Sequence, residues 1–128
     1  MALTEHYDTV DSLEECDVFI NCKCDRFEQV FMLHRAAELG KRVINISSNA
    51  PDQTGTPMYS VYKGALDDLN SRLFYEGVDT TSIRFGYFDS ERVAHIDARK
   101  MSIDYCVSVI DWVLAQPHRV KELTVVPE

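Results

Sequence analysis

The residues best suited to chemistry are Tyr59 and Lys63, four positions apart, and two serines upstream, Ser47 and Ser48. In an α-helix, side chains at positions i and i+4 project from the same face. A nearby ammonium and the positive end of a helix both stabilise tyrosinate, which lowers the tyrosine pKa from its usual value of about 10. We therefore expect Tyr59 to exchange a proton with an alcohol or carbonyl near neutral pH.

These residues need a strand and a helix to position them, and the sequence predicts both. Arg42–Ser47 is an apolar run of strand type that ends at the serines, and Pro57–Glu76 is a helical run. A polar loop joins the two elements. Because ligands of open α/β sheets bind beyond the carboxyl ends of the strands, we expect Ser47 or Ser48 to hydrogen-bond the same substrate oxygen.

Strands and helices alternate along the whole chain. Short connections between alternating elements predict a parallel α/β sheet, here of about four strands with three helices. We predict one domain over residues 1–128, with an acidic arm over residues 1–15 that forms a short helical turn or stays loose. The predicted strands are Asp17–Asn21, Arg42–Ser47, Thr80–Phe85 and Leu123–Val126; the predicted helices are Asp25–Leu39, closed by Gly40, Pro57–Glu76, and a last helix that Ser102 caps and Pro117 ends.

The coverage of this small sheet predicts self-association. Parallel strands are normally buried on both faces, and three helices cover four strands poorly. At least one edge of the sheet is also left open. The helix Asp25–Leu39 carries apolar residues over more than one stripe, so we expect one side to pack on the sheet and another on a partner. The chain is therefore expected to be a dimer or tetramer.

Composition excludes several classes of protein. The chain carries 13 basic and 21 acidic residues, a formal charge of −8, which argues against nucleic acid as the main partner. No apolar run reaches the roughly 18 residues of a membrane span, and the N-terminus does not resemble a signal peptide. The histidines and Cys22-Lys23-Cys24 lack the spacing of a metal site. We expect a cytoplasmic protein with reduced thiols and no metal.

Several segments, in order, resemble the short-chain dehydrogenase/reductase family. The run VINISS…TPMYSVYKGALDDLNSRLFYEGVDTTSIRFGYF is similar to the catalytic half of that family, where a strand ending in serines leads to a Y-x-x-x-K helix. DVFIN and the following NCKC resemble the family's fourth strand and its N-N-A-G segment. The resemblance runs from about Leu13 to the end of the chain. It implies a minimal Rossmann-like sheet that matches the C-terminal half of the family's fold.

The resemblance also implies a function. It predicts an oxidoreductase that uses NAD or NADP on a carbonyl or alcohol, with Tyr59 as acid/base, Lys63 tuning it, and Ser47 or Ser48 orienting the substrate. It places Asn21, Lys63 and Gly86 near the cofactor. In the family, the helices that match residues 25–39 and 57–76 build the main dimer interface, so the resemblance implies a homo-oligomer through these helices.

Two features of the family pattern have no counterpart. The glycine-rich T-G-x-x-x-G-x-G turn, which holds the cofactor's pyrophosphate, has no match, because the five glycines are not clustered. The family's catalytic asparagine has no clear match among Asp25, Arg26 and Gln29. We therefore expect a truncated relative that binds the cofactor poorly alone, unless another copy or another protein completes the sheet. The alternatives are a noncatalytic scaffold or regulatory subunit, and a module that binds a small ligand.

Overall fold

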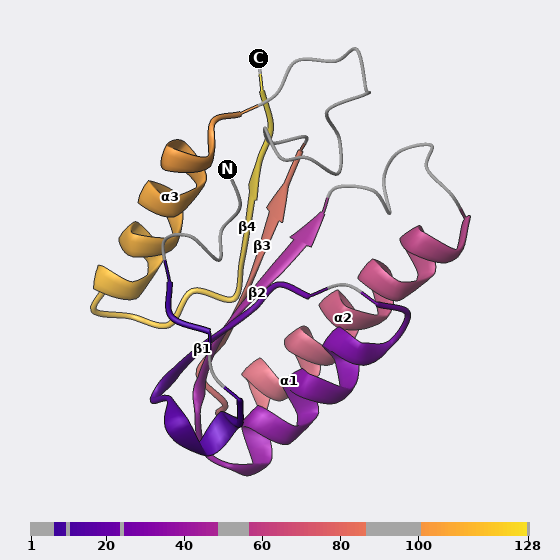
Figure 1. The fold of residues 1–128 in the computed structure, drawn as a ribbon, viewed down its shortest axis with the longest axis vertical. Helices are drawn as coiled ribbons and strands as arrows, with labels where there is room; N and C mark the ends of the chain where they lie inside the picture. Colours follow the sequence, from indigo (N-terminus) through magenta and orange to yellow (C-terminus); the bar gives the residue numbers. More distant parts are fainter. Residues whose placement is uncertain (1–6, 10, 24, 49–56, 87–100, 128) are drawn as a thin grey trace.

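A computed structural model describes residues 7–9, 11–23, 25–48, 57–86 and 101–127 (Figure 1). These residues form one parallel sheet in the order β1-β2-β3-β4. The predicted α/β sheet of four parallel strands with three helices is confirmed. The strands are β1 (Val18–Asn21), β2 (Arg42–Ser48), β3 (Thr80–Phe85) and β4 (Glu122–Val125), and the helices are α1 (Glu28–Glu38), α2 (Pro57–Tyr75) and α3 (Ile103–Ala115).

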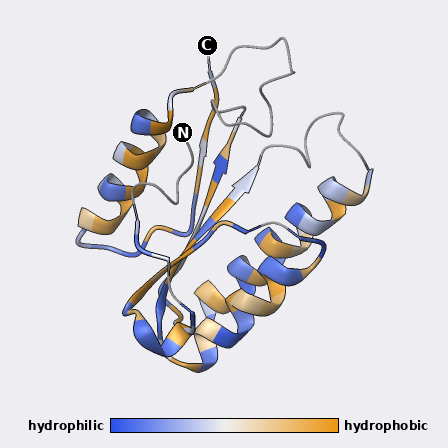
Figure 2. Ribbon diagram, viewed as in Figure 1, coloured by the Kyte–Doolittle hydropathy of each residue, from blue (hydrophilic) through white to orange (hydrophobic). Residues whose placement is uncertain are grey.

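The sheet lies between two unequal layers. Helices α1 and α2 cover one face, and α3 covers the other (Figure 1). Because successive side chains of a strand point to opposite faces, β2 sends Ile44 and Ile46 toward α3 and sends Val43, Asn45 and Ser47 toward α1 and α2. Each helix carries both hydrophobic and hydrophilic residues (Figure 2), as expected for helices that bury one side.

Helix α3 forms where its capping signals predict. The Ser102 side chain accepts a hydrogen bond of 3.1 Å from the Tyr105 N–H, which satisfies one free donor of the first turn. Gln116 is extended, as expected for a residue before proline, so the helix ends ahead of Pro117. None of the described helices combines the length and hydrophobicity needed to cross a membrane. The buried stripe of α3 consists of Ile103, Cys106, Val109, Ile110 and Val113.

Helix α1 is shorter than predicted. It begins at Glu28 rather than Asp25, because Arg26 has a φ of +55°, which an α-helix cannot contain. Its end agrees with the prediction: Gly40 has a φ of +71°, and its N–H donates to the Ala37 carbonyl. The Lys41 N–H donates to the Ala36 carbonyl, which completes a Schellman motif.

The other boundaries that differ from the sequence prediction do so by one residue: β1 begins at Val18, β2 ends at Ser48 and α2 ends at Tyr75. Strand β4 begins at Glu122 and ends at Val125, one residue earlier at each end than predicted. The acidic arm forms a 3-10 turn at Leu13–Glu15, one of the two expected arrangements, and Leu13 is buried against α1 and β2. The predicted loops after Ser48 and after Gly86 lie outside the described residues.

Candidate active site

Helix α2 brings Tyr59 and Lys63 together in its first two turns. The Lys63 ammonium lies over the Tyr59 ring, 5.7 Å from its centroid, so the two residues share a face as their spacing predicts. Tyr59 is half-buried, whereas Lys63 is only 4% exposed. A lysine this deeply buried requires hydrogen-bond partners to offset the loss of water.

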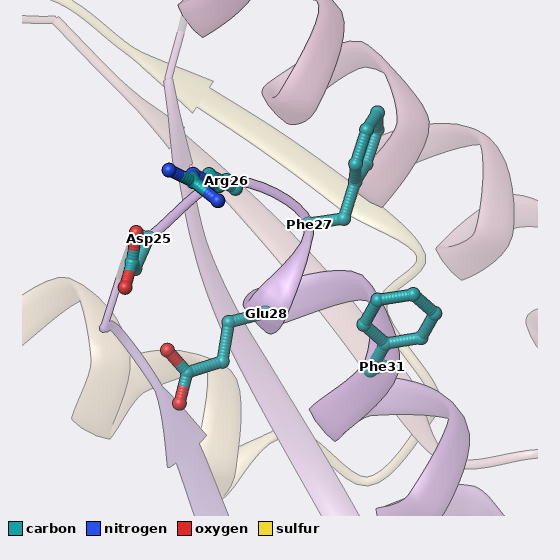
Figure 3. A pocket seen from close by; sticks show the side chains of 5 residues that line it. All are labelled: Asp25, Arg26, Phe27, Glu28 and Phe31. Atoms are coloured by element: carbon teal, nitrogen blue, oxygen red, sulfur yellow. The ribbon is translucent and has the colours of Figure 1, made fainter.

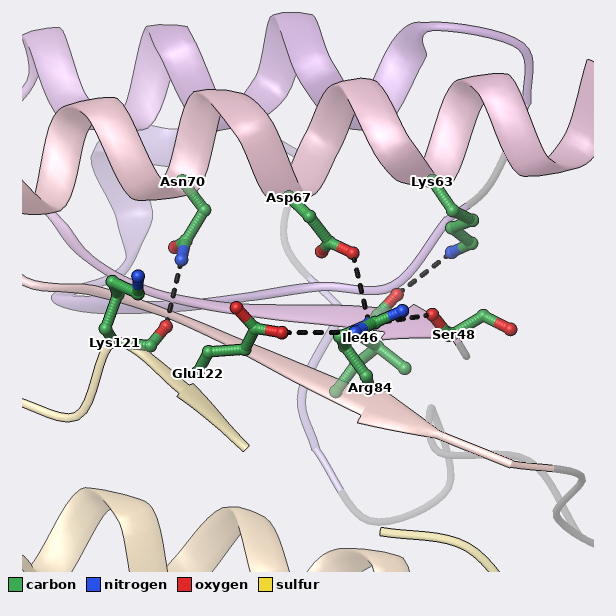
Figure 4. A network of polar contacts seen from close by, with 8 residues as sticks. All are labelled: Ile46, Ser48, Lys63, Asp67, Asn70, Arg84, Lys121 and Glu122. Carbon is green, nitrogen blue, oxygen red and sulfur yellow. Dashed lines mark hydrogen bonds and ion pairs between the residues drawn. The ribbon is translucent and has the colours of Figure 1, made fainter. Parts of the chain in front are cut away.

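Two oxygens hold the Lys63 ammonium. Its Nζ donates to Gln29 Oε1 at 2.7 Å and to the Ile46 carbonyl at 3.0 Å (Figure 4 shows the second contact). Sequence reasoning gave Gln29 no role. The helical spacing of α1 could have indicated that Gln29 is buried. The buried stripe of this helix consists of Gln29, Leu33 and Ala36, and Gln29 is its one polar member. A polar residue at a core position of a helix points to a specific partner.

Gln29 also connects Lys63 to Asn21 at the end of β1. Its Nε2 donates to the Asn21 carbonyl at 2.7 Å and to the Ile46 carbonyl at 3.0 Å. In return, Asn21 Nδ2 donates to the Gln29 carbonyl at 2.9 Å and to Asn45 Oδ1 at 3.0 Å. Asn21, which was predicted to lie near a cofactor, is 2% exposed. Its carbonyl and the Lys63 ammonium are both bonded to the Gln29 side chain, so one side chain connects the two residues.

The two candidate serines differ in position. Ser47 is 3% exposed and faces α2. Ser48 is the last residue of β2 and is half-buried; its carbonyl accepts a hydrogen bond from Arg84 Nε at 3.3 Å (Figure 4). Ser48 is thus the serine at the open carboxyl end of the strand, whereas the Ser47 hydroxyl lies under the helix.

An ion cluster lies one helical turn beyond Lys63. Asp67 Oδ2 is 3.4 Å from Arg84 Nε, and Arg84 also reaches Glu122 on β4 at 3.3 Å (Figure 4). Burial raises the pKa of Asp67, while the Ser47 hydroxyl, the Arg84 charge and the Ser82 hydroxyl act in the opposite direction. Both hydroxyls are buried outside the geometry of a full hydrogen bond.

Gly86 follows β3 and lies against the end of the chain. Its N–H donates to the Val125 carbonyl at 2.9 Å. A Cβ added at this position would lie 2.8 Å from Pro127 Cδ and 3.3 Å from Val126 Cα, so the close approach of this segment requires glycine. Within the described residues, these contacts join Gly86 to the end of the chain and not to the Lys63 cluster, although the resemblance implies a place near the cofactor.

Two further features lie close to the carboxyl end of β1. Burial raises the pKa of the Cys22 thiol, and the Lys63 charge opposes this rise. A shallow pocket at the start of α1 contains none of the predicted site residues; Asp25, Arg26, Phe27, Glu28 and Phe31 line it (Figure 3). Within the described ranges, no three His, Cys, Asp or Glu side chains gather as metal ligands.

Solved structures match this fold, although no protein-family model and no curated protein matches the sequence. A short-chain dehydrogenase from Burkholderia cenocepacia J2315 in complex with NADP matches with a TM-score of 0.58 and 18% identity, over 76% of this chain and 45% of that one. An apo SCOR enzyme from Clostridium thermocellum matches with a TM-score of 0.58 and 20% identity, over 86% and 60%. BdcA in complex with NADPH matches with a TM-score of 0.68 and 13% identity, over 89% and 67%.

These matches confirm the resemblance at the level of the fold. The chain has the α/β fold of the short-chain dehydrogenases over the part that it covers. It spans about half to two thirds of the length of these structures, 45% to 67%.

Proposed function

We propose that this chain carries the nicotinamide end of an NADP(H)-dependent oxidoreductase site that acts on a carbonyl or an alcohol. The observation that carries the proposal is Lys63, a buried ammonium held by Gln29 and the Ile46 carbonyl directly over the Tyr59 ring. This arrangement lies at the carboxyl end of β2, the edge where open α/β sheets bind ligands. Structures of the same fold hold NADP and NADPH.

Three side chains near the carboxyl end of β2 suit one end of the cofactor. The Tyr59 hydroxyl, the Lys63 ammonium and the Ser48 hydroxyl offer hydrogen-bond donors to a ribose and to a substrate oxygen. A bound nicotinamide supplies or accepts the hydride. In this proposal Tyr59 exchanges the proton with the substrate oxygen, and Ser48, rather than the buried Ser47, orients that oxygen.

Gln29 is the positioning residue of the proposed site. Its amide oxygen fixes the Lys63 ammonium, while its amide nitrogen is fixed by two backbone carbonyls. This arrangement keeps the charge beside Tyr59. The pyrophosphate end of the cofactor has no such support, because the sequence offers no cluster of glycines. We propose that a second copy or another protein supplies that wall.

Cofactor binding and turnover together test the proposal. We expect saturable enhancement of NADPH fluorescence with the wild type and its loss with Lys63→Met, after circular dichroism confirms that the variant is folded. NADPH consumption at 340 nm with a panel of small ketones and aldehydes should fall by about 10²-fold or more in Tyr59→Phe, because the proton donor is removed. Tyr62→Phe is the matched control, since the Tyr62 ring packs on Phe27 at 4.7 Å and is assigned no role in the reaction.

We also propose that two copies associate through α1 and α2. Large apolar side chains of these helices are exposed, including Phe31 at 70%, Met58 at 52% and Val61 at 50%. Light scattering should give the mass of a dimer or tetramer for the wild type and a lower mass for Phe31→Asp. Trp112→Asp is the matched control, because Trp112 is 53% exposed on the opposite layer. A monomeric wild type would contradict this part of the proposal.

One observation favours a second candidate, a noncatalytic scaffold. The Lys63 ammonium is 4% exposed and already has two oxygen partners, so it can also serve to fix α1 and α2 to β2. In that case the wild type still associates through α1 and α2, but millimolar NADPH produces no change in fluorescence. The two candidates therefore differ in the binding titration and agree in the mass measurement.

A further inference from the structure

The first described segment, residues 7–9 and 11–17, has contacts on both faces of the sheet. We call this segment the strap. Figure 1 shows its indigo trace leaving the α3 side of the molecule and entering β1 beside α1. Its sequence, YDTVDSLEECD, is polar except for four residues, two of which, Tyr7 and Leu13, serve as anchors.

The two anchors of the strap lie on opposite faces. Tyr7 packs against the apolar cluster between α3 and the sheet, and its hydroxyl donates to Asp111 Oδ1 of α3 at 3.5 Å. Leu13 is 6% exposed and belongs to the cluster on the other face, together with Leu33 of α1. A segment that contacts both faces and then continues into β1 must pass around the β1 side of the sheet.

That side of the sheet is an open edge. Among the described residues, β1 pairs with β2 alone. The Asp17 carbonyl accepts a hydrogen bond from the Arg42 N–H of β2. Backbone groups alternate in direction along a strand, so the N–H and C=O groups of Val18 and Ile20 face away from β2. An unpaired row of such groups is a template for a strand of another molecule.

The strap places only negative charge at this edge. It contains no lysine, arginine or histidine, and all five of its carboxylate side chains are exposed; Glu14 is compensated by Arg35 of α1 at 3.8 Å, and the other four carry the repulsion. Native proteins use charged residues and covering segments to keep open edges from pairing. The five residues are Asp8, Asp11, Glu14, Glu15 and Asp17.

We propose that the strap closes the β1 edge and prevents a second copy of this chain from adding a strand there. Tyr7 and Leu13 hold the strap across the edge, and its carboxylates repel the identical segment of an approaching copy. Release of the strap converts the β1 edge into an interaction surface for a second copy. This surface is distinct from the exposed face of α1 and α2.

Native-state hydrogen exchange tests the anchoring directly. In Tyr7→Ala, the amides of Phe19 and Asn21, which face β2, should exchange about tenfold faster than in the wild type, because β1 opens locally, while the amide of Ile83 keeps its protection. Leu13→Ala should give the same pattern from the other face. Tyr105→Ala is the matched control: Tyr105 is also a tyrosine, belongs to α3 itself, is 49% exposed, and lies outside the strap. Unchanged exchange at Phe19 and Asn21 in Tyr7→Ala would overturn the proposal.

Mass measurements test the consequence. Tyr7→Ala should associate with increasing concentration, and raised salt should strengthen the association because it screens the acidic strap. The experiment is performed in a Phe31→Asp background, which removes association through α1 and α2. Concentration-dependent mass in this background supports pairing at the β1 edge. A monomer at every concentration overturns it, even where Leu13→Ala is too unstable to measure.

The strap does not depend on the proposed function. Its tests use no cofactor, so a failure to bind NADPH leaves them unaffected. Conversely, unchanged exchange in Tyr7→Ala leaves the assignment of Tyr59 and Lys63 unaffected.

Discussion

The two faces of the sheet are built from alternating residues of the same strands, yet they differ in chemistry. Toward α3, strands β2 and β3 present Ile44, Ile46, Ile83 and Phe85, all buried and apolar. Toward α1 and α2, most of the neighbouring positions are polar; Asn45 donates to Asn70 of α2, and Arg84 pairs with Asp67 of α2. The polar positions include Asn45, Ser47, Ser82 and Arg84.

The two faces therefore differ in what they contribute: one stabilises the fold, and the other positions polar side chains. The apolar face contributes cohesion, at about 25 cal/mol for each Å² of apolar surface that it removes from water. The polar face buries less apolar surface and therefore contributes less hydrophobic stabilisation. Its hydrogen bonds and ion pairs fix the positions of the side chains, because each polar group requires a particular partner. Lys63 and Asp67 both project from α2 onto this polar face (Figure 4). The face that carries the proposed site is thus the one with the more specific contacts.

The largest expected effect comes from the apolar face. Phe85 is 1% exposed, so Phe85→Ala should lower the free energy of unfolding by about 3–5 kcal/mol through lost burial and a cavity. Urea unfolding measures this value. Tyr75→Ala is the control, because Tyr75 is 75% exposed and its loss should change stability by no more than about 0.5 kcal/mol. A loss below about 1 kcal/mol in Phe85→Ala would show that this face does not dominate cohesion.

The polar face should show a smaller effect from a substitution that preserves size. Asn45→Leu removes partners from Asn21, Asn70 and Thr80, which bond to it at 3.0, 3.2 and 3.1 Å. Each of these groups keeps one other partner, so the variant loses three buried hydrogen bonds, which should cost about 2–3 kcal/mol in all, again measured by urea unfolding. Ile44→Val on the preceding residue, which faces α3, is the comparison and should cost about 1 kcal/mol. A stabilised Asn45→Leu variant would mean that the hydrogen bonds of Asn45 contribute no net stability.

Much of this contrast could be predicted from the sequence, and part of it could not. Apolar periodicity and the Ser102 cap predicted α3, and the spacing of Tyr59 and Lys63 predicted their shared face. The start of α1 was missed, because the left-handed conformation of Arg26 has no signal in residue type. Gln29 was missed because its partners come from α2 and β2, far away in sequence, and a helical pattern describes only one element.

The smallest expected effect is a pH dependence on the polar face. Burial raises the pKa of Asp67 above its ordinary value of 3.8, so its contribution to stability is full below pH 3.8 and is lost as the pH rises through the folded pKa. Asp67→Asn removes that loss. The stability of the variant relative to the wild type should therefore increase as the pH rises, measured by urea unfolding at several values between about pH 3 and pH 6.

A matched variant separates this effect from the loss of any carboxylate. Asp68→Asn changes the next residue of α2, which is exposed and bonds to Arg72 at 3.1 Å. The rising difference should appear in Asp67→Asn alone. A difference that instead falls with pH would show that the Arg84 charge, 3.4 Å from Asp67, outweighs burial.

The most direct test of the proposed site compares the two faces in one measurement, an NMR titration of the wild type with NADPH. A nicotinamide site on the polar face predicts saturable shifts of the amide signals of Ser48, Tyr59 and Lys63, and unchanged signals for Val109 and Ile110 on the α3 side. Unchanged spectra at millimolar NADPH, or shifts confined to the α3 side, would contradict a nicotinamide site on the polar face.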